Sequence, residues 1–355
     1  MKTKNQIEST INVKSGKRLR IIFSGLLILV IFLLLLDIFL GSVSIKASEV
    51  IKVFFSGGHS NFETIVLKFR LPKAITALTV GVALSISGLQ MQTVFRNPMA
   101  GPYVLGISSG ASMGVAFVIL GFSRGISLES LNGFGNWILV VASWIGAGAV
   151  MLLIMIISSK VKDIMTILIL GIMLSSGISA IVTIMQYFSN ETMLKAYVIW
   201  TMGSLGNLTA SQLNVLLVSV SAGIILSLFS SKILNALLIG ETYARSIGLN
   251  VKFARTLVFI CTSILAGSVT AFCGPIGFIG IAVPHIARII FKTSDHKILI
   301  PGTILTGGAV MLLSDIISQM PGSESVLPVN AVTSLIGIPV VIWVILRSRN
   351  FSGSF

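Results

Sequence analysis

Apolar segments of about 20 residues recur along almost the whole chain, and this feature restricts the fold more than any other. Residues 21–40 form the first segment and contain one ionisable side chain, Asp37. A helix needs about 20 predominantly apolar residues to cross the hydrocarbon core of a bilayer. Only 10% of the 355 residues are charged, whereas charged residues make up about 25% of a soluble domain. The sequence therefore predicts an all-α polytopic membrane protein, because its continuous apolar runs differ from the alternating strands of a β-barrel.

Ten such segments can be placed as membrane spans, which returns both ends of the chain to one side. Most of the 25 Lys and Arg residues then lie on that side, so the positive-inside rule makes it cytoplasmic. This predicts cytoplasmic tails at 1–20 and 347–355, and a single transmembrane domain at 21–346. The outer connections include 41–68 and 189–206, the second with a short re-entrant helix at 193–202. The predicted spans are 21–40, 71–95, 101–121, 137–159, 164–188, 213–229, 256–274, 278–291, 298–318 and 329–346.

Residues 231–255 form the longest predicted cytoplasmic connection between two spans. Their apolar residues alternate with small and charged ones, as two short amphipathic helices would, and Gly240 and Gly248 are natural end points for them. Lys232 and Arg255 place positive charge near both ends. Two helices on the cytoplasmic face make a docking surface for another protein. The simpler alternative is an ordinary interfacial loop, and the pattern alone leaves both open.

The net charge of +14 would suggest nucleic-acid binding in a soluble protein. No basic module here stands free of the apolar segments, and positive cytoplasmic loops that face anionic lipid explain the charge. We therefore expect membrane lipid, and no nucleic acid, as a partner. Cys261 and Cys273 belong to no C-x-x-C pair or Cys/His cluster, so neither a zinc site nor a disulfide framework is predicted.

No sequence motif supplies bond-making chemistry. The patterns G-x-x-x-x-G-K-[ST], H-E-x-x-H and G-x-S-x-G are absent, so we expect no catalytic residue, metal or cofactor on this chain, and a membrane-anchored enzyme is disfavoured. Ionisable groups within the spans are few: Asp37, Asp315, and His285 with Arg288. An ion- or proton-coupled secondary transporter usually has more of them, and it remains the alternative of another class.

Lys68, Arg70 and Lys73 form a cationic cluster at the outer mouth of the second span, against the positive-inside trend. Long cationic side chains can anchor at lipid phosphates. They can also dock an acidic external partner, since Arg pairs with a carboxylate through two parallel hydrogen bonds. Both interpretations stay open.

Gly106, Gly110 and Gly114 repeat every four residues in span 101–121, with Ser108 and Ser109 beside them. Such a face of small residues allows two helix backbones to approach closely. The same face could line a translocation path, and the two roles are compatible.

Several segments together resemble the binding-protein-dependent ABC importer permeases for iron–siderophore, haem and vitamin B12. The resemblance runs from about residue 67 to residue 347 and keeps the family's order and spacing of motifs. The segments are FRLPKAITALTVGVALSISGLQMQTVFRNPMAGPYVLGISSGAS, GETYARSIGLN, AGSVTAFCGPIGFIGIAVPHIARII, SDHKILIPGTILTGGAVMLLSD and LPVNAVTSLIGIP.

The resemblance implies a type II ABC importer permease with about ten transmembrane helices and both termini cytoplasmic. It implies a homodimer with the path between the two copies, and two ABC ATPase subunits that bind ATP and Mg and dock on residues 231–255. An extracytoplasmic substrate-binding protein would cap the outer face, and the complex would lie in the bacterial cytoplasmic (inner) membrane. The implied function is import of an iron chelate (siderophore), with haem or cobalamin as alternatives.

The resemblance also assigns roles to individual residues of this sequence. The motif R-L-P-[RK] assigns binding-protein docking to Arg70 and Lys73, and a third arginine of the family is replaced by Gln319. The residues with a weaker assignment, to the translocation path, are Ser85, Ser108 and Ser109. The motif G-[DE]-x-x-A-R-S-[IL]-G assigns ATPase docking to Gly240, Glu241, Ala244, Arg245, Ser246 and Gly248.

Overall fold

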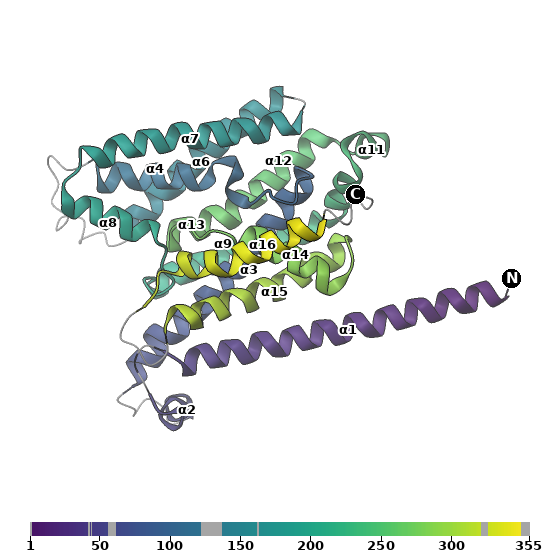
Figure 1. Cartoon of the computed structure of the whole chain (residues 1–355), viewed down its shortest axis with the longest axis horizontal. Coiled ribbons are helices and arrows are strands. Elements are labelled where there is room, and N and C mark those ends of the chain that lie inside the picture. Colours follow the sequence, from purple (N-terminus) through teal and green to yellow (C-terminus); the bar gives the residue numbers. More distant parts are fainter. Residues whose placement is uncertain are drawn as a thin grey trace.

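The computed structural model describes residues 2–41, 43, 45–55, 62–121, 137–161, 163–320 and 326–348, and every regular element within these ranges is helical. Helix α1 (Lys2–Phe39) runs along one side of a helical bundle and extends past it at the N-terminal end (Figure 1). The other elements are α2 (Ala47–Phe55), a π-helix (Thr64–Arg70), α3 (Leu71–Val94), a 3-10 helix (Pro102–Leu105), α4 (Ile107–Ile119), α6 (Trp137–Lys160), α7 (Ile164–Tyr187), α8 (Glu191–Thr201), α9 (Ala210–Phe229), α10 (Ser231–Ile239), α11 (Glu241–Ser246), α12 (Val251–Thr262), a second π-helix (Ser263–Gly267), α13 (Ser268–Cys273), α14 (Ile279–Phe291), α15 (His296–Ser318) and α16 (Val329–Ser348).

Seven helices in the described part of the chain are long and apolar enough to cross a membrane. Three shorter apolar helices, α4, α14 and the first 16 residues of α16 (Val329–Val344), correspond to the remaining predicted spans. α4 and α14 have 13 residues each, so they are about 20 Å long, shorter than the hydrocarbon core of about 30 Å. The all-helical, multi-pass architecture is confirmed, whereas the count of ten spans stays a prediction.

Helix α3 lies at the centre of the bundle, and each of its residues from 79 to 94 is buried. It packs against α15, α14, α9 and α12. Glycines bring the backbones close: a Cβ atom on Gly81 would lie 2.3 Å from the carbonyl oxygen of Gly307 in α15. A Cβ atom on Gly88 would lie 1.7 Å from the carbonyl oxygen of Gly280 in α14. A helix enclosed by other helices needs apolar or small residues all round, which explains why α3 has no charged face.

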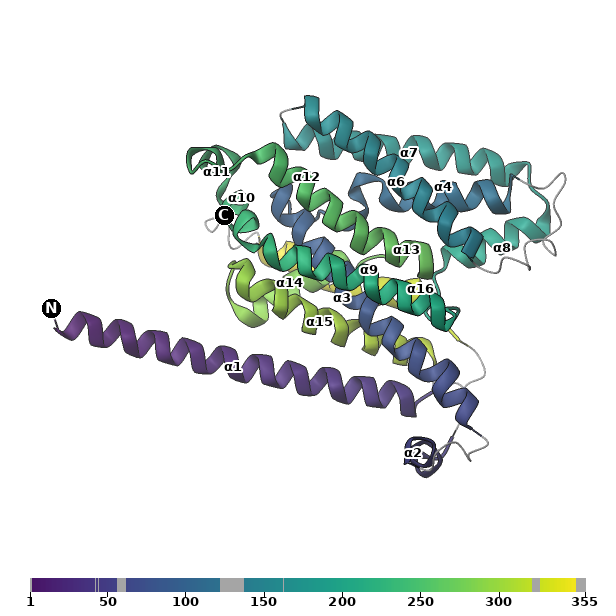
Figure 2. The same cartoon turned by 180° about the vertical axis from the view of Figure 1, so that it is seen from behind.

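Helices α4, α6, α7 and α8 lie together on the side of the bundle opposite α1 (Figures 1 and 2). A Cβ atom on Gly110 would lie 2.5 Å from the carbonyl oxygen of Gly146 in α6, and one on Gly114 would lie 2.0 Å from that of Ala142. These two glycines therefore have the predicted packing role. Gly106 differs, because its φ of +79° places it at the start of α4, where the preceding 3-10 helix ends. The prediction of one continuous helix over 101–121 is wrong, since a residue in this left-handed conformation interrupts the helix.

Three predicted boundaries also change. The outer connection 41–68 contains α2, and the π-helix Thr64–Arg70 continues directly into α3. The connection 231–255 is shorter than predicted: α12 begins at Val251, because the side chain of Asn250 accepts a hydrogen bond from the Phe253 amide at 3.1 Å and caps the helix. The N-terminal tail continues α1 as helix from Lys2, and the predicted C-terminal tail lies outside the described residues from 349 onward.

Substituting Gly88→Ala should lower the thermal midpoint of the detergent-solubilised protein, because the added methyl group would overlap the Gly280 carbonyl and force α3 away from α14. Overpacking of this kind costs about 1–3 kcal/mol. Gly148→Ala in α6 is the matched control, since a Cβ atom there meets no atom within 4 Å. Thermal unfolding followed by intrinsic fluorescence compares the two variants. Equal midpoints for them would contradict the close contact.

Candidate functional site

Helices α10 and α11 form a short two-helix unit at the end of the bundle where α1 begins and α16 ends (Figures 1 and 2). Gly240 separates the two helices with a φ of +137°, and Gly248 follows α11 with a φ of +85°. Both conformations are strained for residues with a side chain. The amides of Gly248 and Leu249 donate to the carbonyls of Arg245 and Ala244 at 3.0 and 2.9 Å, which closes the end of α11. The prediction of two short helices bounded by these glycines is confirmed.

Glu241 and Ala244 hold α11 in place and do not face outward. Ala244 is fully buried. The Glu241 carboxylate accepts a hydrogen bond from Nε of Arg255 at 2.8 Å and pairs with its Nη2, and Arg255 is only 3% exposed. Arg255 is buried and the Glu241 side chain is 22% exposed. Removing the carboxylate would take a charge partner from a buried guanidinium, which is costly, so this pair fixes α11 against α12. Sequence reasoning missed the role of Arg255, because Glu241 and Arg255 lie on different helices and no local pattern shows how α11 folds back on α12.

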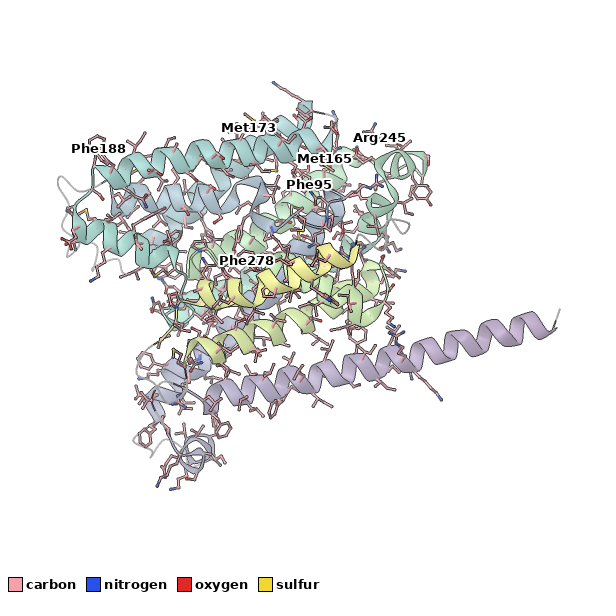
Figure 3. All side chains as sticks on the ribbon, in the orientation of Figure 1. Phe95, Met165, Met173, Phe188, Arg245 and Phe278 are labelled. Carbon is pink, nitrogen blue, oxygen red and sulfur yellow. The ribbon has the colours of Figure 1, made fainter. Side chains whose placement is uncertain are left out.

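The outward surface of this unit includes Tyr243, Arg245, Ser246 and Ile247 of α11 and the residue after it, and we call these four residues the docking surface. Tyr243 and Ile247 are 45% and 56% exposed. Arg245 lies on α11 at the edge of the molecule (Figure 3), with its guanidinium 3.6 Å from the Glu241 carboxylate. Exposed apolar residues beside a cation are typical of a protein interaction site. Arg245 and Ser246 thus belong to the surface, whereas the other four predicted docking residues shape its backbone or lie beneath it.

At the opposite end of α3, Arg70 is turned into the protein. Its guanidinium donates to the carbonyl oxygens of Ile38, Phe39 and Val43 at 3.1, 2.9 and 2.5 Å, and the residue is 8% exposed. It therefore satisfies carbonyl groups at and after the C-terminal end of α1, which have no partner within that helix. Lys68 of the predicted cationic cluster is exposed.

Lys73 belongs to a buried polar cluster between α1, α3 and α15. Its Nζ lies 3.0 Å from Oδ1 of Asp315. The side-chain amide of Gln319 donates to Asp37 at 2.6 Å and to Asp315 at 3.0 Å, and both carboxylates are at most 2% exposed. Buried ionisable groups in membrane proteins usually pair in this way. Sequence reasoning identified each acid but not their meeting through Gln319.

A cavity of about 710 Å³ lies beside Lys73 and Asp315. Polar groups of Asn207 and Gln212 share its wall with the aromatic rings of Trp200 and Phe272, among other residues. Figures 1 and 2 place the helix ends that form it away from the docking surface, at the other end of the bundle. Its volume lies in the range of small-molecule sites.

A second hollow of about 260 Å³ is lined mainly by hydroxyl groups from α4, α7 and α8, and we call it the hydroxyl groove. No Asp, Glu, Lys, Arg or His lines it. Its polar residues are Ser108, Ser109, Ser112, Ser179, Thr183, Gln186, Tyr197 and Thr201. Residues four apart share one helix face, so the pair Ser179 and Thr183 was the signal in α7 that sequence reasoning missed.

The structure does not bring Ser85 together with Ser108 and Ser109. Ser85 is fully buried where α3 meets α15, and its Oγ lies 2.3 Å from the position that a Cβ atom on Gly307 would take. Its position is that of a small residue at a close helix contact.

Within the described ranges, no three His, Cys, Asp or Glu side chains gather closely enough to hold a metal ion. Both cysteines are buried free thiols. Cys261 lies 3.2 Å from the amide nitrogen of Gln90 and 3.1 Å from the hydroxyl of Ser227. The thiol therefore takes part in a polar contact that joins α3, α9 and α12.

Comparison with known proteins agrees with this geometry. Among solved structures, a metal-chelate type ABC transporter in an inward-facing conformation has a TM-score of 0.79 and 26% sequence identity, covering 92% of this chain and 99% of that chain. PsaBC from Streptococcus pneumoniae, solved in complex with a Fab, has a TM-score of 0.51 and 15% identity, covering 84% and 95%. The second likeness concerns the fold alone.

Sequence comparison is more specific. The vitamin B12 import system permease proteins BtuC of Salmonella paratyphi A and Salmonella typhimurium are each 35% identical to this chain over 287 residues, which is 81% of this chain and 85% of theirs. The model of the FecCD transport family matches residues 28–347. The chain therefore belongs to the FecCD transport family, as an ABC importer permease.

Proposed function

We propose that two copies of this chain form the transmembrane part of an ATP-driven importer, with two separate ATPase subunits on the docking surface. The observation that carries the proposal is the α10–α11 unit, whose glycine ends and part-buried Glu241–Arg255 pair leave Tyr243, Arg245 and Ile247 exposed. The unit connects the long helices α9 and α12. A displacement imposed on it would therefore reach the bundle directly.

In this proposal, ten helices cross the bacterial cytoplasmic membrane, and both chain ends share the cytoplasmic side with the docking surface. The start of α1, the end of α16 and the docking unit lie at the same end of the bundle, which supports this orientation (Figures 1 and 2). The 3-10 helix Pro102–Leu105 would extend the crossing of the short α4. Residues 21–346 would then be the transmembrane domain, surrounded by membrane lipid, with 1–20 and 347–355 as cytoplasmic tails.

The chain would contribute a change of packing rather than bond chemistry. ATP and Mg, bound by the ATPases, would draw those subunits together, and the docking units would move with them. The two permease copies would then rock and change which side of the path between them is open. The equilibrium between the two arrangements of the permease shifts only when a ligand binds them with different affinity. ATP must therefore favour one arrangement of the docking units.

The hydroxyl groove is our candidate for part of the path. Its neutral donors and acceptors can hold a polar cargo weakly at several points, and weak binding at several sites lets a cargo both enter and leave a path. Ser108 and Ser109 lie in it. Ser85 would contact the path only if α3 and α15 separated.

The proposed cargo is a polar metal chelate. An iron–siderophore is our first choice among the cargoes that the family resemblance allows, and haem is the least suited to a groove lined by hydroxyl groups. The BtuC relatives, named as vitamin B12 permeases, favour cobalamin as the second candidate. An extracytoplasmic binding protein would deliver the cargo, with Lys73 exchanging Asp315 for a carboxylate of that partner and Arg70 holding the end of α1 beside it.

The sequence left a proton-driven secondary transporter open as a second class, but membership of a family of ABC importer permeases overturns it, and the bonds of Asp37 and Asp315 to Gln319 are then structural. Uptake into cells with a collapsed proton gradient and a maintained ATP level should therefore continue, and loss of uptake would contradict the ATP-driven importer.

Arg245→Glu should weaken retention of a P-loop ATPase when this protein is purified from native membranes, because the charge on the docking surface is reversed. A loss of about 1.4 kcal/mol corresponds to about tenfold weaker binding. Lys252→Glu is the matched control, since Lys252 is exposed on the adjacent α12 but outside the docking surface. Co-purified ATPase is quantified per permease. Retention by R245E equal to that by K252E would remove Arg245 from the interface, and no ATPase with the wild type would count against the class.

The purified complex in liposomes, with its binding protein, should import a ferric siderophore or cyanocobalamin, and haem much less. The measurement is ATP-dependent accumulation of each labelled compound in parallel. Accumulation of cyanocobalamin alone would replace the iron–siderophore assignment by cobalamin. Accumulation of haem in preference to both would contradict the polar-chelate proposal.

Thr183→Cys and Ser109→Cys should react with a charged, water-soluble thiol reagent, because the hydroxyl groove would face water. Ile184→Cys is the control: its side chain is 59% exposed on α7 but does not line the groove, so it should face lipid and stay unmodified. The native cysteines are buried and provide a low background. Labelling in intact membranes is scored by mass shift. A T183C variant as inert as I184C would exclude a water-filled groove.

A further inference from the structure

A hydrogen-bonded cluster joins the docking unit to the centre of the bundle. Asn235 of α10 donates through Nδ2 to Oδ1 of Asp295 at 2.7 Å. Its Oδ1 accepts from the backbone amide of His296 at 2.9 Å and lies 2.7 Å from Nδ1 of the same residue. On the other side of the imidazole, Nε2 lies 2.8 Å from Oγ1 of Thr93 in α3. One imidazole therefore links α10, α15 and α3.

The chemistry of the partners fixes how this cluster is oriented. The hydrogen bond from Asn235 is the main cause that lowers the pKa of Asp295 below its ordinary value. The backbone amide of His296, which faces the other end of the Asn235 side chain, can only donate. The amide nitrogen of Asn235 must then face Asp295, and its oxygen must face His296. An oxygen acceptor requires hydrogen on Nδ1, so in the neutral imidazole Nε2 is an acceptor. It shares the single hydrogen of the Thr93 hydroxyl with the Leu89 carbonyl, which lies 2.8 Å from the same oxygen. The cluster is thus directional and tolerates few substitutions.

Burial makes the cluster costly to break. His296 is 1% exposed and Thr93 is not exposed at all, and a buried polar group without a partner costs about 1–3 kcal/mol. α10 packs against α3 and α15, whereas α11 packs against α10 and α12. The His296 cluster therefore lies where the docking unit meets the two central helices.

The same two helices are joined again at their far ends. Thr93 is near the end of α3 and His296 begins α15, whereas Lys73 is near the start of α3 and pairs with Asp315 near the end of α15. The helices are thus antiparallel and linked by polar side chains at both ends. Between these links, Gly81 and Gly307 bring the backbones into contact. Because α3 and α15 are linked at both ends and their backbones touch between the links, the two helices form one stiff body, the α3–α15 pair.

We propose that Thr93, Asn235 and His296 are positioning residues that transmit the state of the ATPases to the far end of the α3–α15 pair. The inference rests on the proposed function. The docking unit moves the pair through the imidazole, and the pair carries the displacement to Lys73 and Asp315, where the binding protein would dock. The α3–α15 pair also transmits a displacement in the reverse direction, so docking of the binding protein changes the ATPase rate.

The test uses the complete complex in liposomes and compares the ATPase rate with and without its binding protein. Thr93→Val removes the hydroxyl at nearly constant volume and should reduce this stimulation about fivefold, a coupling at the lower end of the usual range. Thr93→Ser keeps the hydroxyl and should retain stimulation. Thr306→Val is the matched control, because Thr306 is buried in α15 and its hydroxyl donates to Gly302 of the same helix at 2.8 Å.

The outcomes separate this inference from the proposed function. Absence of an ATPase, or of stimulation, in the wild-type complex counts against the proposed function itself. Wild-type stimulation in T93V, or an equal loss in T93V and T306V, overturns the inference. If T93V fails to assemble, the thermal midpoint of the permease is measured instead for T93V, for Asn235→Ala and for the double variant. Strictly additive shifts of the midpoint would also overturn the inference, because substitutions of linked groups are not additive.

Discussion

The structure depends on the backbone contacts of α3. Lipid tails are as apolar as leucine side chains, so helices in a membrane associate through close packing and polar contacts rather than through apolar burial. Gly81 and Gly88 let α3 touch the backbones of α15 and α14, at positions where a single methyl group would overlap a carbonyl oxygen. With α3 enclosed in this way, those of its polar side chains that form hydrogen bonds do so either with carbonyl groups of α3 itself or with neighbouring helices.

Those polar side chains then determine which helices meet. Gln92 accepts from Arg288 at 2.6 Å and donates to the Ile281 carbonyl at 3.1 Å, so it uses both ends of its amide on α14. Gln90 likewise donates to Ser227 and accepts from Thr262, at 2.9 and 3.1 Å. An unsatisfied polar group in a low-dielectric interior is costly, so a shift of α3 by one turn would lose several bonds together. Glycine contacts allow the packing, and the glutamines select one register.

The sequence predicts where the helices lie along the chain better than it predicts how far each residue is buried and which residues contact each other. Apolar length locates the long helices, and Gly240 and Gly248 locate the ends of the docking helices, because both signals are local. The split at Gly106 escapes, since a glycine within an apolar run reads equally as a packing residue. The role of Arg70 also escapes: its charge suggests an outer surface, but the partners are carbonyl groups about 30 residues away in the chain. Long-range pairs such as Asp37 with Gln319 have no local pattern at all.

The positions of the groove and of the central pair bear on how transport would work. The hydroxyl groove lies on α4, α7 and α8, whereas the polar links from the docking unit lead to α3 and α15. If the helices of the groove and the α3–α15 pair moved together, a displacement of the docking unit could not change the opening of the groove. In the proposed mechanism, the α3–α15 pair and the helices that line the groove would therefore shift against each other, and α12, which leaves the docking unit, packs on α6 as well as on α3. The π-helix Ser263–Gly267 that follows α12 is a form of helix frequently found at functional sites.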